Sequence, residues 1–325
     1  MDLKHKTIVF LILLSAHILT STVAGQTAGQ SRIKLPPQTA EPVVLDVTVT
    51  DRSGGFLMGL KSDDFEVTID KKPAQIVSLN QADSPVSVGF LLDSSGSASQ
   101  QSSEQTAKTF LTLRDAIRHF LESSNQANDY FLMAFNTKPQ LLADWTSDPA
   151  AIVDKFYGLR VSGNTALYDA CYLAVDKLHG GRHEKRALVL VSDGMDNLSH
   201  YTFNQLRDLL RETNVLIYSI NFQSDRVQGM LGEEGASILK DLSFISGGKP
   251  FSDIEGALLK LKHANAAFET IATELRNQYT LSIVPSEPLA PKKWHKIKVK
   301  VNLQRGGQPR VKGLSVRTRE GFYVR

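Results

Sequence analysis

Hydrophobic and polar residues follow three successive patterns along the chain. Residues 43–79 contain three short β-patterned segments separated by turn residues, and the first two alternate at period two over part or all of their length, which is typical of half-buried antiparallel strands. Residues 279–324 return to this pattern with four candidate strands. Between these segments, nearly continuous apolar runs alternate with segments whose apolar residues recur at helical spacing. The patterns therefore predict a β segment, an α/β domain and a second β segment.

The middle region predicts a doubly wound α/β fold with a mainly parallel sheet. Its apolar runs have the length and composition of strands that are buried on both faces. These expected strands are 86–92, 130–135, 187–191 and 215–220. The expected helices are one with an apolar face from Ala107 to Phe120, then 167–178, 203–210, 238–244 and 254–275. Strands that alternate with helices in this way indicate a parallel sheet covered by helices on both faces.

The two outer β segments are each too small to form a convincing core. Together they have the strand count of a small β-sandwich. We therefore expect the α/β domain to be inserted into a β-sandwich-like region formed by the N- and C-terminal segments. The alternative is that the segments are two separate decorations of the α/β domain. The predicted boundaries are 43–82, 85–277 and 278–325.

The N-terminus predicts export. Two lysines precede an apolar run at residues 8–14, and small residues follow, which is the order found in a secretory signal peptide. The run is short for about 30 Å of hydrocarbon, although a membrane anchor is the alternative. We expect residues 1–25 to be removed and residues 26–42 to form a flexible linker. The mature protein is expected in the medium, the periplasm or the cell envelope, with no transmembrane anchor.

Composition excludes collagen, disordered tails and multi-span membrane proteins. The 325 residues are 42% hydrophobic and 22% charged, which is an ordinary globular balance. A net charge of +3 gives no general electrostatic case for nucleic-acid binding. The single cysteine, Cys171, excludes an internal disulfide and a multi-cysteine zinc site, and we expect it to be buried. Lysines alternate with apolar residues over 296–301, so we expect a strand with one solvated face.

Oxygen-bearing side chains follow the first buried strand directly. Asp93, Ser95 and Ser97 occur at every second position of one loop, at the strand end where open α/β sheets bind ligands. Such hard oxygen donors suit Mg²⁺, Mn²⁺ or Ca²⁺ better than zinc or copper. The alternative is that they only cap the next helix. Farther along the chain, Thr165 opens a helix and Asp193 follows another buried strand.

This ordered set resembles the metal-ion-dependent adhesion site of the von Willebrand factor type A domain, whose pattern is D-x-S-x-S, then a threonine, then an aspartate. The flanking β segments and the final Arg319–Tyr323 are similar to a bacterial family of VWFA-related proteins best known from acidobacteria. One departure is Asp70-Lys71-Lys72-Pro73, where that family usually has D-G-K-P. The resemblance implies a cation site, most readily for Mg²⁺, in which hydroxyls bind directly and aspartates act largely through water. Its residues would be Asp93, Ser95, Ser97, Thr165 and Asp193.

The resemblance implies a secreted, metal-dependent protein-binding or adhesion module in which a partner's Asp or Glu carboxylate fills an open position on the ion. We expect no enzymatic activity, because no histidine occurs in the three predicted metal loops to act as a general base. Two alternatives stay open, a hydrolase that uses the metal to activate water and a structural domain with an idle site.

Two further aspartates lie near the motif in sequence. Asp169 is expected to support the ligands or to act as a first-turn helix charge, and Asp196 falls outside the pattern.

Overall fold

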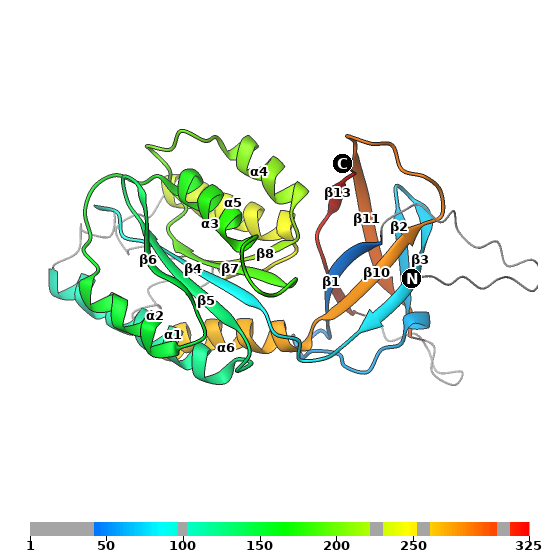
Figure 1. Cartoon of the computed structure of the whole chain (residues 1–325), viewed down its shortest axis with the longest axis horizontal. Coiled ribbons are helices and arrows are strands. Elements are labelled where there is room, and N and C mark those ends of the chain that lie inside the picture. Colours follow the sequence, from blue (N-terminus) through cyan, green and yellow to red (C-terminus); the bar gives the residue numbers. More distant parts are fainter. Residues whose placement is uncertain (1–41, 97–102, 222–229, 252–260, 304–312, 325) are drawn as a thin grey trace, which may run out of the picture. The chain divides into compact units, whose positions relative to one another are not determined.

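The structure, a computed structural model, describes residues 42–96, 103–221, 230–251, 261–303 and 313–324, which are arranged around two sheets (Figure 1). All of them belong to one unit of the chain, Pro36–Arg325. The predicted signal peptide and Ser97 lie outside the described residues. Within the described ranges, no helix has the length and apolarity needed to cross a membrane.

The middle region forms a six-stranded sheet in the order β6-β5-β4-β7-β8-β9. All neighbouring strands are parallel except β6, which runs antiparallel to β5. The strands are β4 (Ser87–Asp93), β5 (Asp129–Phe135), β6 (Pro139–Thr146), β7 (Arg186–Ser192), β8 (Val215–Asn221) and β9 (Pro250–Phe251). The four predicted strands are therefore confirmed within a residue or so at each end. The sequence analysis missed β6 and β9.

Helices cover both faces of this sheet, as a doubly wound fold requires. They are α1 (Ser103–Ser123), α2 (Pro149–Val153), α3 (Leu167–Leu178), α4 (Phe203–Glu212), α5 (Met230–Ser246) and α6 (Leu261–Asn277). Side chains alternate across β4, so Phe90 packs in the core beneath α1 and α6 while Leu91 packs beneath α3, α4 and α5. Gly89 lacks a side chain where the Phe131 ring lies, and a Cβ there would approach the ring to 2.4 Å.

The outer segments form a second, antiparallel sheet of seven strands in the order β12-β1-β10-β3-β2-β11-β13. The strands are β1 (Val43–Thr50), β2 (Phe65–Ile69), β3 (Lys72–Asn80), β10 (Tyr279–Pro285), β11 (Trp294–Val301), β12 (Ser315–Arg317) and β13 (Gly321–Tyr323), with a short 3₁₀ helix, η1 (Ser62–Asp64), before β2. N- and C-terminal strands are interleaved and share one hydrophobic core. The alternative of two separate decorations is therefore wrong.

The strand order explains how the α/β domain is inserted. The chain leaves the second sheet at the end of β3 and returns on the adjacent strand β10, where Asn80 is paired with Thr280. Paired strands are only about 5 Å apart, so both ends of the insert start from one place. Closely spaced ends of this kind are what allow one domain to be inserted into another.

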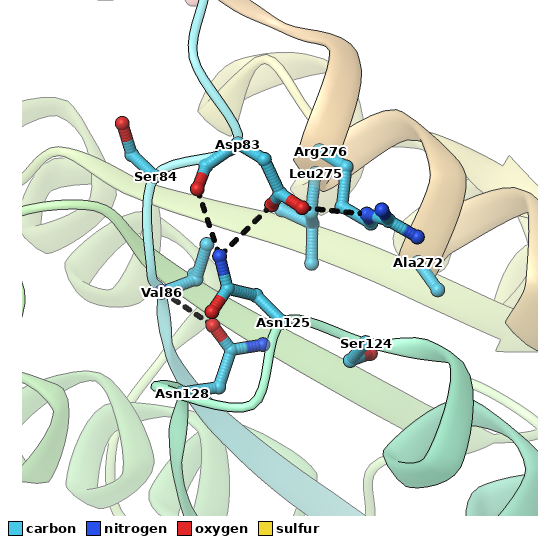
Figure 2. Close-up of a pocket in the computed structure, with 9 residues that line it drawn as sticks. All are labelled: Asp83, Ser84, Val86, Ser124, Asn125, Asn128, Ala272, Leu275 and Arg276. Carbon is cyan, nitrogen blue, oxygen red and sulfur yellow. Dashed lines mark hydrogen bonds and ion pairs between the residues drawn. The ribbon is translucent and has the colours of Figure 1, made fainter.

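Two segments connect the α/β domain to the second sheet, one between β3 and β4 and the other at the end of α6. Hydrogen bonds hold them together at the amino end of β4 (Figure 2). The Nε of Arg276 donates to Asp83 Oδ2 at 2.8 Å, and Asn125 Nδ2 donates to the Asp83 carbonyl at 2.8 Å. The Val86 N–H donates to Asn128 Oδ1 at 2.8 Å. These residues line a small pocket whose polar groups bind one another. Ligands of open α/β sheets bind at the opposite, carboxyl edge, so we assign no function to this pocket.

Two further predictions are confirmed. Cys171 lies on the buried face of α3 among apolar residues, and burial raises the pKa of its thiol, so it behaves as a small hydrophobic side chain. On β11, Lys296, Lys298 and Lys300 are exposed while Ile297 is buried. The lysines therefore form the solvated face of a strand, as their alternation predicts.

Candidate metal-binding site

The candidate site lies at the carboxyl edge of the six-stranded sheet, between β4 and β7. The chain leaves β4 toward α1 on one face and leaves β7 toward α4 on the other, which makes this gap a topological switch point where ligands bind. Asp93 ends β4 and Asp193 follows β7 directly. The Ser192 hydroxyl bridges the two strands by donating to Asp93 Oδ2 at 2.7 Å.

The loop after β4 is a tight turn held to β5. Asp93 Oδ1 accepts a hydrogen bond from the Ser95 N–H at 2.9 Å, as in an Asx turn. The N–H and the hydroxyl of Ser94 both donate to the Phe135 carbonyl, at 2.8 and 2.9 Å. Ser95 is fully buried. Asp93 and Ser95 are thus fixed before any ligand binds, while Ser97 lies outside the described residues.

The loop that carries Thr165 is bonded to this first loop. The Gly96 N–H donates to the Gly163 carbonyl at 2.8 Å, and the Ser162 N–H donates to the Ser94 carbonyl at 3.1 Å. Thr165 itself is buried and lies just before α3. These bonds bring a residue from the middle of the chain beside the end of β4.

The third loop, after β7, turns sharply at Gly194. This residue has a φ of +81°, and a Cβ on it would lie 2.1 Å from the Gly235 carbonyl oxygen of α5. Only glycine tolerates both the backbone conformation and the close approach. The Met195 N–H donates to Asp193 Oδ1 at 3.0 Å, which orients the buried Asp193 carboxylate.

Four of the five predicted site residues therefore lie on loops that are hydrogen-bonded to one another or to neighbouring strands at one edge of the sheet. They are Asp93, Ser95, Thr165 and Asp193. The three loops that carry the motif are spread over about a hundred residues of sequence, and they lie together in the structure.

The electrostatics of the site fit a bound cation. Burial, followed by repulsion from Asp193, raises the pKa of Asp93 to about 6, against hydrogen bonds from Ser95 and Ser192 that lower it. All the donors are carboxylate or hydroxyl oxygens, which hard divalent cations prefer. In the part of the chain that the structure describes, no group of three or more His, Cys, Asp or Glu side chains could form a metal cage. A cation here would therefore depend on hydroxyls and water to complete its coordination.

The structure also shows supporting residues that the sequence analysis missed or described incompletely. Asp196, which falls outside the motif, accepts a hydrogen bond from the Tyr168 N–H at the start of α3. Asn197 Oδ1 accepts from the Thr165 N–H at 2.9 Å. Asp169, on the first turn of α3, binds the backbone of His200 and Tyr201. The signal in the sequence is the group of short polar residues Asp196, Asn197 and Ser199, which follow Ser192-Asp193-Gly194 within six positions.

One histidine lies closer to the site than the sequence analysis expected. His200 belongs to the continuation of the third loop, and its Nδ1 is 2.9 Å from Asp169 Oδ2. Its side chain is 92% exposed. A general base acts on a substrate held against it, and so exposed a ring has little protein around it to hold one.

Comparison with known proteins agrees with this fold and motif. The family model of the von Willebrand factor type A domain matches residues 88–195, a range that contains all five motif residues. Among curated proteins, no match to the sequence is found.

Three solved structures illustrate the structural likeness. An aerotolerance-related membrane protein from Bacteroides fragilis is 15% identical, with a TM-score of 0.45, over 58% of this chain and 98% of that one. The PilB minor pilin from Streptococcus sanguinis is 14% identical, with a TM-score of 0.47, over 61% and 62%. The vWF domain of the pilus tip protein Mfa5 from Porphyromonas gingivalis is 20% identical, with a TM-score of 0.30, over 34% and 38%. The match thus spans less than two thirds of the last two chains. Over residues 88–195, this chain therefore matches the von Willebrand factor type A domain family.

Proposed function

We propose that this protein is an exported protein-binding module that uses a divalent cation, Mg²⁺ in the first place, to capture a carboxylate of a protein partner. The observation that carries the proposal is the meeting of three loops at the switch point, with two buried aspartates among serine and threonine hydroxyls. The residues proposed to hold the ion are Asp93, Ser95, Ser97, Thr165 and Asp193.

The donor set explains why such an ion would capture a partner. Hydroxyls are neutral, so an ion bound through them keeps most of its positive charge. Asp93 and Asp193 offset part of that charge. A calcium cage, in contrast, surrounds its ion with several carboxylates and leaves little attraction for another. A partner's Asp or Glu that entered an open position would therefore be attracted by charge and oriented by coordination.

Binding of a partner is favoured over hydrolysis. A hydrolase needs a base that contacts the substrate beside the metal, and His200, which lies on the continuation of the third loop, is almost fully exposed. If the site were catalytic with His200 as its base, the protein would turn over a substrate in Mg²⁺, and His200→Ala would abolish that turnover without changing cation affinity. We expect no such turnover to be found.

Cation binding is tested by titrating Mn²⁺, followed calorimetrically and by electron paramagnetic resonance. Asp93→Asn is expected to weaken binding by more than about tenfold, because even residues that only support metal ligands contribute that much. The matched control is Asp129→Asn, since Asp129 is equally buried and hydrogen-bonded to Ser87 but lies at the opposite edge of the sheet. Equal effects of the two substitutions would contradict the proposed site.

Partner capture is tested with an array of peptides that carry Asp or Glu, each paired with its Asn or Gln counterpart. The wild-type protein is expected to bind a subset of acidic peptides in Mg²⁺ and to release them in EDTA. Thr165→Ala should affect this capture more than it affects the bare ion. Binding that persists in EDTA, or that does not distinguish Asp from Asn, would contradict metal-dependent capture of a carboxylate.

Export is tested on the native protein by mass spectrometry of its N-terminus. The expected start is near Gly25 or Gln26, where small residues follow the apolar run. Recovery of the form that begins at Met1 from the cytoplasm would contradict the prediction.

A further inference from the structure

The start of α3, directly after Thr165, is capped by another loop. Ala166 occupies the N-cap position and makes no side-chain capping bond. The first N–H groups of a helix need partners from elsewhere. Here the Tyr168 N–H donates to Asp196 Oδ1 at 3.3 Å and the Asp169 N–H donates to the Ser199 hydroxyl at 3.0 Å. The Ser199 hydroxyl in turn donates to Asp196 Oδ1 at 2.5 Å.

The same helix turn binds that loop in return. Asp169 Oδ1 accepts hydrogen bonds from the backbone N–H groups of His200 and Tyr201, both at 2.8 Å. Burial acts to raise the pKa of Asp169, but the hydrogen bonds from Tyr201 and His200 outweigh it and the pKa is lowered, so the carboxylate is ionised near neutrality. The Tyr201 ring also stacks on Tyr172 of α3, with ring centroids 3.9 Å apart and planes within 3°.

These contacts converge on Thr165. Its N–H donates to Asn197 Oδ1 at 2.9 Å, and its carbonyl accepts from the N–H groups of Asn197 and Leu198 at 3.0 and 3.1 Å. Both backbone groups of the threonine are therefore held by the loop that follows Asp193. We call residues 196–201 together with residues 165–172 the clamp.

We propose that the clamp positions Thr165 for cation binding and that Asp169 is its main positioning residue; this inference rests on the proposed function. Asp169 binds residues 200 and 201, and the same loop binds Thr165 through residues 197 and 198. Loss of the carboxylate would free one end of the clamp. The Thr165 backbone would then lose the fixed partner that sets its place beside the first loop.

The first experiment needs no metal. Hydrogen exchange of the amides at residues 165–170 is compared between wild type, Asp169→Ala and the control Asp176→Ala, whose exposed carboxylate lies farther along the same helix. We expect exchange about tenfold faster in Asp169→Ala, as for a local opening made about 1.4 kcal/mol easier, and no change in the control. Unchanged protection in Asp169→Ala would overturn the clamp. If that variant does not fold, Ser199→Ala replaces it, because it removes one contact of the same clamp.

The second experiment measures Mn²⁺ affinity in wild type, Asp169→Ala, Thr165→Ala and the double variant. Each single substitution is expected to weaken binding by about tenfold. The double variant should be no more than about threefold weaker than Thr165→Ala, because Asp169 acts through Thr165. If the losses of Mn²⁺ affinity in the two single variants multiplied fully in the double variant, Asp169 would not act through Thr165, and its positioning role would be overturned. A wild-type protein that binds no Mn²⁺ would overturn the proposed function, and the exchange experiment would then decide the clamp by itself.

Discussion

Replacing Asp93 by asparagine should stabilise the cation-free protein, although it removes a residue of the proposed metal site. Asp93 is buried at the end of β4, and Asp193 lies close enough to raise its pKa. Asparagine has nearly the shape of a protonated aspartate and carries no charge. The substitution therefore removes the repulsion while leaving an oxygen to accept one hydrogen bond.

The magnitude follows from the pKa. In the folded protein the pKa of Asp93 is about 6, compared with 3.8 for an ordinary aspartate. Because the folded state holds the proton more tightly, the free energy of unfolding falls as pH rises from about 4 to about 6 and then levels off. The shift corresponds to about 3 kcal/mol at pH 8. We subtract about 1 kcal/mol for a hydrogen bond that the amide cannot make, which leaves an expected gain of about 2 kcal/mol.

The assay is urea unfolding of wild type and Asp93→Asn in EDTA, at pH 8 and at pH 5. The gain of about 2 kcal/mol at pH 8 should fall by about 1.4 kcal/mol at pH 5, where most of the Asp93 carboxylate in the folded wild type is protonated. Added Mg²⁺ should narrow the difference at pH 8 by stabilising the wild type alone. Asp129→Asn serves as the control, since it removes a buried aspartate from the opposite edge of the sheet, and it should bring no gain in stability.

Two results would refute this reasoning. If Asp93→Asn were less stable than wild type at pH 8 in EDTA, the hydrogen bonds from Ser95 and Ser192 would outweigh the cost of the buried charge. If its gain did not change between pH 5 and pH 8, the gain would not come from ionisation of Asp93.

Three further predictions concern the stability of the fold. Chelation should leave the circular dichroism spectrum largely intact and shift the melting temperature only modestly, because the cores are apolar; global unfolding in EDTA would contradict this. Arg317→Met should cost about 3 kcal/mol in urea unfolding, because it removes the cationic partner of the buried Glu274 carboxylate, and adding Glu274→Gln should recover part of that loss. Lys71→Gly should raise the free energy of unfolding by about 1 kcal/mol and so raise the melting temperature, because Asp70 and Lys71 form a two-residue hairpin turn with φ values of +49° and +70°; an unchanged or lower melting temperature would contradict this.

The sequence predicted the α/β sheet well where strands are buried on both faces. β4, β5, β7 and β8 are continuous apolar runs, and all are buried along nearly their whole length. β6 was missed because it is an edge strand whose mostly exposed or half-buried side chains give no such run. The same limit applies to β9, since two residues cannot show a period.

The sequence predicted the strands of the second sheet but not the order in which they pair. Alternation identifies a half-buried strand from its own residues, so β1, β2, β3, β10 and β11 were recognisable. The pairing of β3 with β10 joins residues about two hundred positions apart, and no local pattern specifies it. Only the shortage of strands in each segment indicated that the two must combine, and this argument led to the insertion.

At the site, the residues of the motif could be predicted from the sequence, whereas the residues that hold the loops in place could not. Asp93, Ser95, Thr165 and Asp193 were recognisable because their loops follow strands or open a helix in a known order. Asp169 was left with two possible roles and Asp196 was given none, because their partners are backbone N–H groups of distant segments, which any residue supplies. A sign was nevertheless present, since Ala166 is a poor N-cap for a helix that begins at the ligand loop. A helix that lacks its own cap at such a place requires one from elsewhere, and here the loop that follows the last predicted ligand supplies it.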